Sequence, residues 1–283
     1  MNSSYLHSII LEICANNAGA IAAHRGDHTH ALFLDLIQQV DPALSSRLHN
    51  EPEYRPFTVS MLSGVNIRNG KAFLQVGQPY RLRVTLLDGG HLWQYLSAYF
   101  LETSPITLRL DKAEFVLTRV LSTSSADITG WAGYADWQTL AATLSRKDIT
   151  MRFASPSAFS MGDRRFALFP EPILLWDSLM RSWNRYAPEV LHIDKTAMRD
   201  FVTRNVTISG YNLHTTCLYF PKYTQRGFLG TCSYSIQEIT DGCAPQLSAL
   251  AEFARYSGVG YKTTMGMGQT RIEEIEESLR HDR

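Results

Sequence analysis

The sequence predicts an α+β fold of two tandem ferredoxin-like units, each running strand, helix, strand, strand, helix, strand. Three observations support this prediction. The chain has 283 residues, enough for two domains of about 140 residues each. Stretches that alternate with a period of two are interleaved with stretches of helical periodicity. The same order of elements restarts after residue 140, so we expect an N-terminal domain over 1–140 and a C-terminal domain over 141–283.

The first unit opens with a strand over 5–15, where YLHSIILEICA alternates, and continues with a helix over 29–40, where apolar residues recur three and four apart. Asp41 followed by Pro42 is typical of a helix N-cap and first turn, which predicts a short second helix over 41–49. The remaining elements are predicted in this order: strands at 55–62, 72–76 and 80–87, a helix at 90–102 with Leu92, Tyr95 and Leu96 facing the core, and a strand at 113–122. In the strand at 80–87, one face carries Tyr80, Leu82, Val84 and Leu86, and the other carries Arg81, Arg83 and Thr85.

The second unit repeats this plan in the order of its elements, not in its letters. Its helix over 170–187 is strongly periodic, with Leu175, Leu179 and Trp183 on one face. The other predicted elements are a strand at 148–159, two long strands at 204–220 and 225–239 joined by PKYT as a hairpin, a helix at 244–258 that ends at Gly258, and a last strand near 268–275.

Composition narrows the functional classes. Hydrophobic residues make up 45% of the chain and charged residues 19%, which indicates a globular protein. The 27 basic and 27 acidic side chains balance, so a nucleic-acid site requires local segregation of charge; residues 141–230 carry 12 Lys or Arg against 7 Asp or Glu, which fits a binding groove or a solvated face equally well. No pair of the four cysteines has C-x-x-C spacing, and no run of about 18 apolar residues occurs. We therefore expect reduced thiols, no metal, no membrane partner and a cytoplasmic location.

The stretch SGVGYKTTMGMGQT, residues 257–270, holds four glycines within eleven positions. It lies between a predicted helix and a predicted strand, which is the reverse of the order in a dinucleotide fingerprint or a P-loop, and its spacing matches neither motif. A purely structural interpretation is a glycine C-cap followed by an irregular strand start. The functional interpretation, which four glycines favour, is contact with a phosphodiester backbone. Its residues would be Gly258, Gly260, Tyr261, Lys262, Thr263, Thr264, Gly266 and Gly268.

Two stretches resemble a known family. GVGYKTTMGMGQT, following a helix at the end of two ferredoxin-like units, resembles the glycine-rich loop of the RAMP superfamily. HALFLDLIQQVDPALSSRLHNEPEYRPFTVSML, residues 30–62, resembles the first helix, the short second helix ending in Leu-His and the next strand of the CRISPR-associated repeat-processing endoribonucleases. The resemblance implies metal-independent cleavage of CRISPR precursor RNA within each repeat, by attack of a ribose 2′-hydroxyl on the adjacent phosphate. The products would be a 2′,3′-cyclic phosphate and a 5′-hydroxyl. The resemblance implies CRISPR repeat RNA as the partner, no cofactor, and a homodimer as a common state.

Cleavage of this kind needs a proton acceptor for the 2′-hydroxyl, a proton donor for the leaving 5′-oxygen and positive charge near the phosphate. His49 occupies the Leu-His position of the family and precedes an irregular loop, so we expect it to act as general base or acid. Arg55 lies where the family often has a basic residue that stabilises the phosphate, and Tyr54 is an alternative donor or a loop-packing residue. The family's usual tyrosine on the first helix is absent here.

His28 and His30 form a second centre at the start of the first helix. Some family members carry catalytic histidines there, so His30 is an auxiliary catalytic candidate, and Arg25 and His28 are candidate RNA-binding residues. His-x-His also raises metal binding, but Asp27 is the only nearby carboxylate and no third ligand has suitable spacing. Further basic residues that could contact RNA are Arg164 and Arg165 in a turn-rich segment, and Lys222 and Arg226 at the predicted hairpin tip.

Two other functions stay open from the sequence. One is a RAMP subunit that binds guide RNA in an interference complex, with other subunits as partners, and does not cut it. The other is a nucleotide-utilising enzyme built around the glycines, which the failed motifs disfavour.

Overall fold

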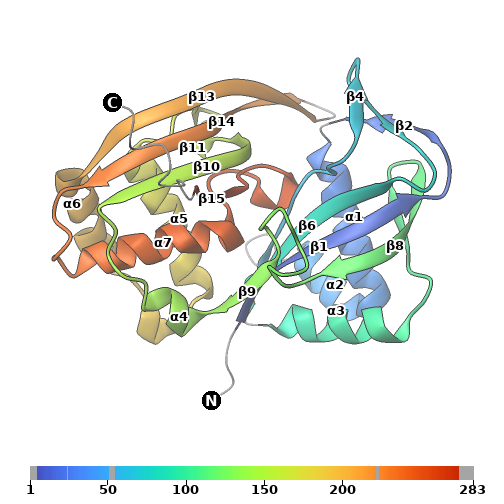
Figure 1. Ribbon diagram of the computed structural model, residues 1–283, viewed down its shortest axis with the longest axis horizontal. Coiled ribbons are helices and arrows are strands. Elements are labelled where there is room, and N and C mark those ends of the chain that lie inside the picture. The colour runs from blue at the N-terminus through green and yellow to red at the C-terminus, as the bar shows by residue number, and fades with distance from the viewer. Residues whose placement is uncertain (1–4, 24, 51–54, 89, 221–222, 274–283) are drawn as a thin grey trace.

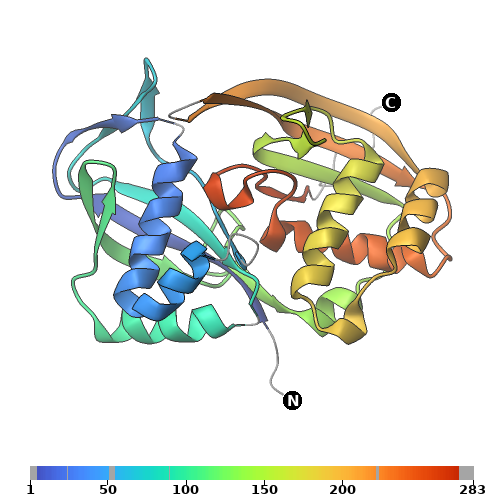
Figure 2. The same ribbon diagram turned by 180° about the vertical axis from the view of Figure 1, so that it is seen from behind.

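The computed structural model describes residues 5–23, 25–50, 55–88, 90–220 and 223–273. Two main sheets lie next to each other, and each is covered on one face by helices (Figures 1 and 2). Helices α1 (Gly26–Val40) and α5 (Pro172–Tyr186), which belong to different halves of the chain, lie in front of their sheets in Figure 2. The predicted α+β fold of two tandem ferredoxin-like units is confirmed.

The N-terminal sheet has the strand order β3-β6-β1-β8-β7, and β9 pairs with the start of β1. Its four inner strands β3, β6, β1 and β8 pair antiparallel, in the arrangement of a ferredoxin-like unit. Helix α1 buries Leu32, Phe33 and Leu36 in the core beneath this sheet. The elements are β1 (Tyr5–Ala15), α2 (Pro42–Asn50), β3 (Phe57–Val59), β6 (Pro79–Leu86), α3 (His91–Glu102), β7 (Thr107–Leu110), β8 (Ala113–Leu121) and β9 (Gly133–Asp136).

The C-terminal sheet has the order β13-β14-β10-β15, again antiparallel throughout. Helices α5 and α7 pack against it, and α5 buries Leu175, Leu179 and Trp183 on the face that its periodicity predicts. The strands β13 and β14 form the expected long hairpin, paired from Val206↔Ile236 to Phe220↔Tyr223. The elements are β10 (Asp148–Ser157), β13 (Val206–Phe220), β14 (Tyr223–Ile236), α7 (Cys243–Ser257) and β15 (Thr270–Ile272).

Strand β6 joins the two units through its second face. The first face is buried in the N-terminal core, as the alternation predicts, by Tyr80, Leu82, Val84 and Leu86. Arg83 and Thr85 on the other face are also buried, because the C-terminal unit covers them. The Arg83 guanidinium donates to the Gln269 side chain and to the Arg255 carbonyl, and Thr85 Oγ1 donates to the Tyr256 carbonyl over 2.6 Å. These bonds hold the two units in one orientation.

Several elements were not predicted, since they are short or fall in turn-like sequence. They are β2 (Gly19–Ala22), β4 (Asn66–Arg68), β7, α4 (Trp137–Ala141), β11 (Phe159–Ser160), β12 (Phe166–Ala167), η1 (Glu189–Leu191), α6 (Lys195–Asn205) and η2 (Thr263–Met265). Strands β2 and β4 flank β5 (Lys71–Leu74) in a small separate sheet. Tyr95 was predicted to face the core and is 52% exposed; α3 buries only Leu92 and Leu96, so its buried stripe is narrower than predicted.

The connection between the units runs through α4. Trp137 of α4 packs edge-on against Trp183 of α5, with ring centroids 5.1 Å apart, in the C-terminal core. The domain division at residues 140 and 141 thus falls within a helix and stays a prediction. Within the described residues, no helix is long and apolar enough to cross a membrane.

Candidate functional site

The glycine-rich loop leads from α7 to β15 and turns sharply several times. Gly258, Gly260, Gly266 and Gly268 all have positive φ, at 61°, 77°, 84° and 73°. Lys262 also has φ at 57°, a conformation that side chains other than glycine rarely adopt. The amide of Gly258 donates to the Ala254 carbonyl over 2.9 Å, which confirms the glycine C-cap of α7.

Protein backbone lies directly against three of these glycines. A Cβ atom at Gly260 would overlap the Ala158 carbonyl oxygen, one at Gly268 would overlap the Val259 carbonyl oxygen, and one at Gly258 would lie 2.7 Å from the Gly268 carbonyl oxygen. The packing of the protein alone therefore requires glycine at these positions. Contact with a phosphodiester stays a prediction, and it falls mainly on the side chains between the glycines.

The same loop docks on the N-terminal unit. The amide of Gly266 donates to the Val59 carbonyl on β3 over 2.9 Å. Gly26, the first residue of α1, lies so close to Met265 that a Cβ atom there would overlap the Met265 carbonyl oxygen. The sequence analysis did not single out Gly26, because its neighbour is more than two hundred residues away in the chain.

His30 contacts this loop from α1. Its side chain is buried, stacks on Phe57 with ring centroids 5.8 Å apart, and places Nδ1 3.0 Å from the Thr264 carbonyl oxygen. A carbonyl oxygen only accepts, so Nδ1 carries the proton of this bond. The geometry favours a positioning role for His30, which stays a catalytic candidate by prediction.

The other predicted catalytic residues lie around the end of α2. His49 is in the last turn of this helix, and its side chain lies outside the described residues, as does Tyr54. Arg55 follows directly, and its Nε is buried without a hydrogen-bond partner among the described residues. An unpaired buried guanidinium nitrogen is costly, so this atom is suited to an incoming acceptor.

Arg55 and the glycine-rich loop line a cavity of about 500 Å³, which we call the loop pocket. Helix α5 closes its far side, and the Gly260 amide donates to Ser178 Oγ of this helix over 2.8 Å. The described lining holds four cationic side chains and no Asp or Glu. They come from three separate parts of the chain: Arg55, Arg181, Arg185 and Lys262. Eight hydroxyl groups complete the polar lining: Thr58, Ser178, Ser182, Tyr186, Ser257, Tyr261, Thr263 and Thr264.

The ammonium group of Lys262 lies among aromatic rings. Its Nζ is 4.0 Å from the ring centroid of Phe220, 4.6 Å from that of Tyr223 and 5.5 Å from that of Tyr261. Partial burial lowers the pKa of Lys262, while Asp27 raises it to a smaller extent. The side chain thus joins the loop to the tip of the β13–β14 hairpin as well as lining the loop pocket.

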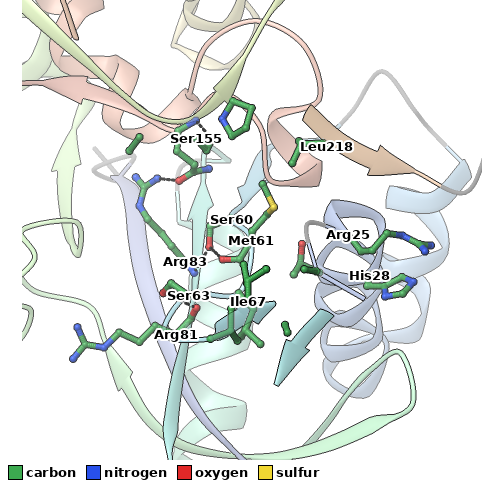
Figure 3. Close-up of a pocket in the computed structure, with 18 of the residues that line it drawn as sticks. Arg25, His28, Ser60, Met61, Ser63, Ile67, Arg81, Arg83, Ser155 and Leu218 are labelled. Carbon is green, nitrogen blue, oxygen red and sulfur yellow. Dashed lines mark hydrogen bonds between the residues drawn. The ribbon is translucent and has the colours of Figure 1, made fainter. Parts of the chain in front are cut away.

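Arg25 and His28 lie in a different place from His30. They line an apolar cavity of about 540 Å³ between the two sheets, with Arg81 and Arg83 of β6 on its other side (Figure 3). Arg25 donates to both carboxylate oxygens of Asp27, at 2.9 and 2.7 Å, and this hydrogen bonding raises its pKa. Two histidines only two residues apart therefore serve different surfaces, because α1 turns by about 200° over that interval.

The remaining predicted RNA-binding residues do not line the loop pocket. Arg164 and Arg165 are exposed in the turn between β11 and β12, where Arg165 lies 3.7 Å from Asp163. Arg226 is exposed on β14 near the hairpin tip, and Lys222 lies outside the described residues. Sequence reasoning missed Arg181 and Arg185, whose four-residue spacing on the polar face of α5 was the available signal.

Comparison with known proteins identifies the family. The model of the CRISPR Cas6 N-terminal domain matches residues 5–142, and that of the CRISPR-associated endoribonuclease Cas6 matches residues 151–270. The chain is 32% identical to the CRISPR-associated endoribonuclease Cas6 of Streptococcus thermophilus over 125 residues, which are 43% of this chain and about half (49%) of that relative.

Solved structures agree over nearly the whole chain. A Cas6 product complex has a TM-score of 0.79 at 28% identity and covers 96% of this chain and 100% of that one. Thermus thermophilus Cas6 has a TM-score of 0.73 at 27% identity and covers 96% and 99%. The chain belongs to the Cas6 family of CRISPR-associated endoribonucleases.

Proposed function

We propose that this protein is an endoribonuclease that cleaves CRISPR precursor RNA within its repeats to produce guide RNAs. The loop pocket carries the proposal. It brings Arg55, which follows the Leu-His helix, against the glycine-rich loop in a cationic setting whose described lining holds no acid. A polyanion bound there would meet positive charge from both domains.

The proposed reaction needs no metal. The 2′-hydroxyl upstream of the cut attacks the phosphorus, the bond from phosphorus to the 5′-oxygen breaks, and a 2′,3′-cyclic phosphate and a 5′-hydroxyl result. His49 removes the proton of the 2′-hydroxyl or supplies the proton to the leaving oxygen, with Tyr54 as an alternative donor. Arg55 stabilises the charge of the pentavalent phosphate, and its unpaired Nε supports this role. Lys262, Thr263 and Thr264 hold the RNA backbone beside it.

The test uses end-labelled repeat RNA from the CRISPR array encoded beside this gene, incubated with EDTA. We expect one cut per repeat and a terminus that phosphatase removes only after acid opens the cyclic phosphate. RNA with a 2′-deoxynucleotide upstream of the cut should bind but not be cleaved. Tight binding of the all-ribose RNA without products would instead support a guide-binding subunit.

His49→Ala is the sharpest variant. Loss of a proton-transfer group lowers rates by about 10²- to 10⁴-fold, and we expect single-turnover cleavage to fall by this amount with little change in RNA affinity. His214→Ala on β13, an exposed histidine that lines neither cavity, is the matched control. Unchanged cleavage by His49→Ala would remove His49 from the mechanism.

A further inference from the structure

We propose that Arg181 and Arg185 of α5, here called the α5 arginine pair, bind the sugar–phosphate backbone of the RNA strand next to the scissile phosphate. This inference rests on the proposed function and extends its binding site onto the C-terminal domain. It starts from the lining of the loop pocket, where the pair lies across from Arg55.

The helix presents the pair in a suitable way. The two arginines are four residues apart on α5, which places them on one face and about 6 Å apart along the helix axis. Both side chains are exposed, whereas the opposite face of the helix is buried in the C-terminal core. The helix is therefore anchored by its apolar side, and the arginines project from a rigid support.

Charge near the pair is uncompensated by carboxylates. The described lining of the loop pocket contains no acid, and Asp177, the acidic residue of α5, is bound to Arg199 of α6. Four cations around one cavity repel one another, so an anion is needed to balance them. The guanidinium groups offer planar, paired N–H donors, which match phosphate oxygens.

The size and lining of the cavity favour a polymer backbone over a single small anion. A volume of about 500 Å³ exceeds what one phosphate fills, and the cations are spread from β3 and its preceding residue to α5 and the glycine-rich loop. Hydroxyls of Ser178, Ser182 and Thr263 lie between these cations and can bond to ribose and phosphate oxygens. Contacts of this kind position an RNA strand without reading its sequence.

The test measures binding separately from cleavage. Repeat RNA with a single 2′-deoxynucleotide upstream of the cut is titrated at several salt concentrations against wild type, the double variant Arg181→Ala/Arg185→Ala, and Arg204→Ala. Arg204 is an exposed arginine of α6 that lines neither cavity. We expect the double variant to bind about 10- to 100-fold more weakly, and Arg204→Ala to bind as wild type. Each lost phosphate contact lowers the slope of log Kd against log salt by about 0.7–0.9, so the slope should fall by about 1.5.

Further arms distinguish the outcomes. Arg181→Lys/Arg185→Lys should keep the salt slope, which a folding defect of the double variant would not explain. Inorganic phosphate at millimolar concentration should not displace the RNA. Wild-type affinity and slope in the double variant would overturn the inference even if the all-ribose RNA is cleaved normally. Arginine-dependent binding without any cleavage of that RNA would instead overturn the proposed catalysis and support the inference.

Discussion

The Nδ1 atom of His30 lies 3.0 Å from the carbonyl oxygen of Thr264, which joins the first helix of the N-terminal unit to the glycine-rich loop of the C-terminal unit. With the Gly266 amide on the Val59 carbonyl, this bond fixes the loop next to β3 and the residues that precede it. The loop pocket therefore exists only while the two units are held in this arrangement.

His30→Ala removes that bond. We expect the free energy of unfolding to fall by about 1–2 kcal/mol, because the Thr264 carbonyl loses its partner, and cleavage to fall with it. His30→Asn can donate from a similar position and should recover part of both. Thermal unfolding and single-turnover cleavage measure the two effects. A variant with wild-type stability and no cleavage would show that His30 transfers a proton.

Gly26→Ala inserts a methyl group where the Met265 backbone lies. Since backbone cannot move aside cheaply, we expect destabilisation of about 3 kcal/mol and a marked loss of repeat-RNA cleavage. The control is Gly19→Ala on β2, where an added Cβ meets nothing within 4 Å and φ is not positive. Urea unfolding of both variants checks the prediction, which fails if they match.

Lys262→Met keeps the length of the side chain and removes its charge from the rings of Phe220 and Tyr223. We expect a loss of about 1 kcal/mol and faster amide exchange at the end of β13, because the hairpin tip is less firmly held to the loop. Hydrogen exchange detected by mass spectrometry measures this. Unchanged exchange at the hairpin tip, with weaker RNA binding, would assign Lys262 to RNA contact alone.

His7 on β1 makes the fold sensitive to acid. It stacks on Trp93, with ring centroids 5.2 Å apart, and burial lowers its pKa to about 4. The unfolded chain, with a pKa of about 6.5, binds a proton first as the pH falls, so stability is present at neutral pH and is lost below it. We expect the contribution of His7 to fall by about 2 kcal/mol between pH 7 and pH 4.5.

The check is His7→Phe, which should remove this part of the pH dependence in urea unfolding measured at several pH values. His192→Phe is the control, since the contacts of His192 lie elsewhere, in the C-terminal unit. An unchanged pH dependence in His7→Phe would assign the acid sensitivity to other groups.

The periodic elements could be predicted because their pattern is local. Alternation in β6 and helical spacing in α5 record which side of each element faces its own core, and both predictions are confirmed. The small sheet of β2, β4 and β5 was missed in part, since its short strands lie in sequence that is typical of turns.

By itself the sequence determined the order of the elements, the buried face of most of them, and the presence of an unusual backbone at Gly258 to Gly268. Only the tertiary structure decided what lies against those glycines, which is backbone of the protein itself, including Ala158. It also decided that His28 and His30 face different surfaces and that the α5 arginine pair meets Arg55 in one pocket. These outcomes depend on how two separate units are placed against each other. Hydrophobic periodicity reports burial within a unit, whereas the placement follows from specific long-range bonds such as those of Arg83.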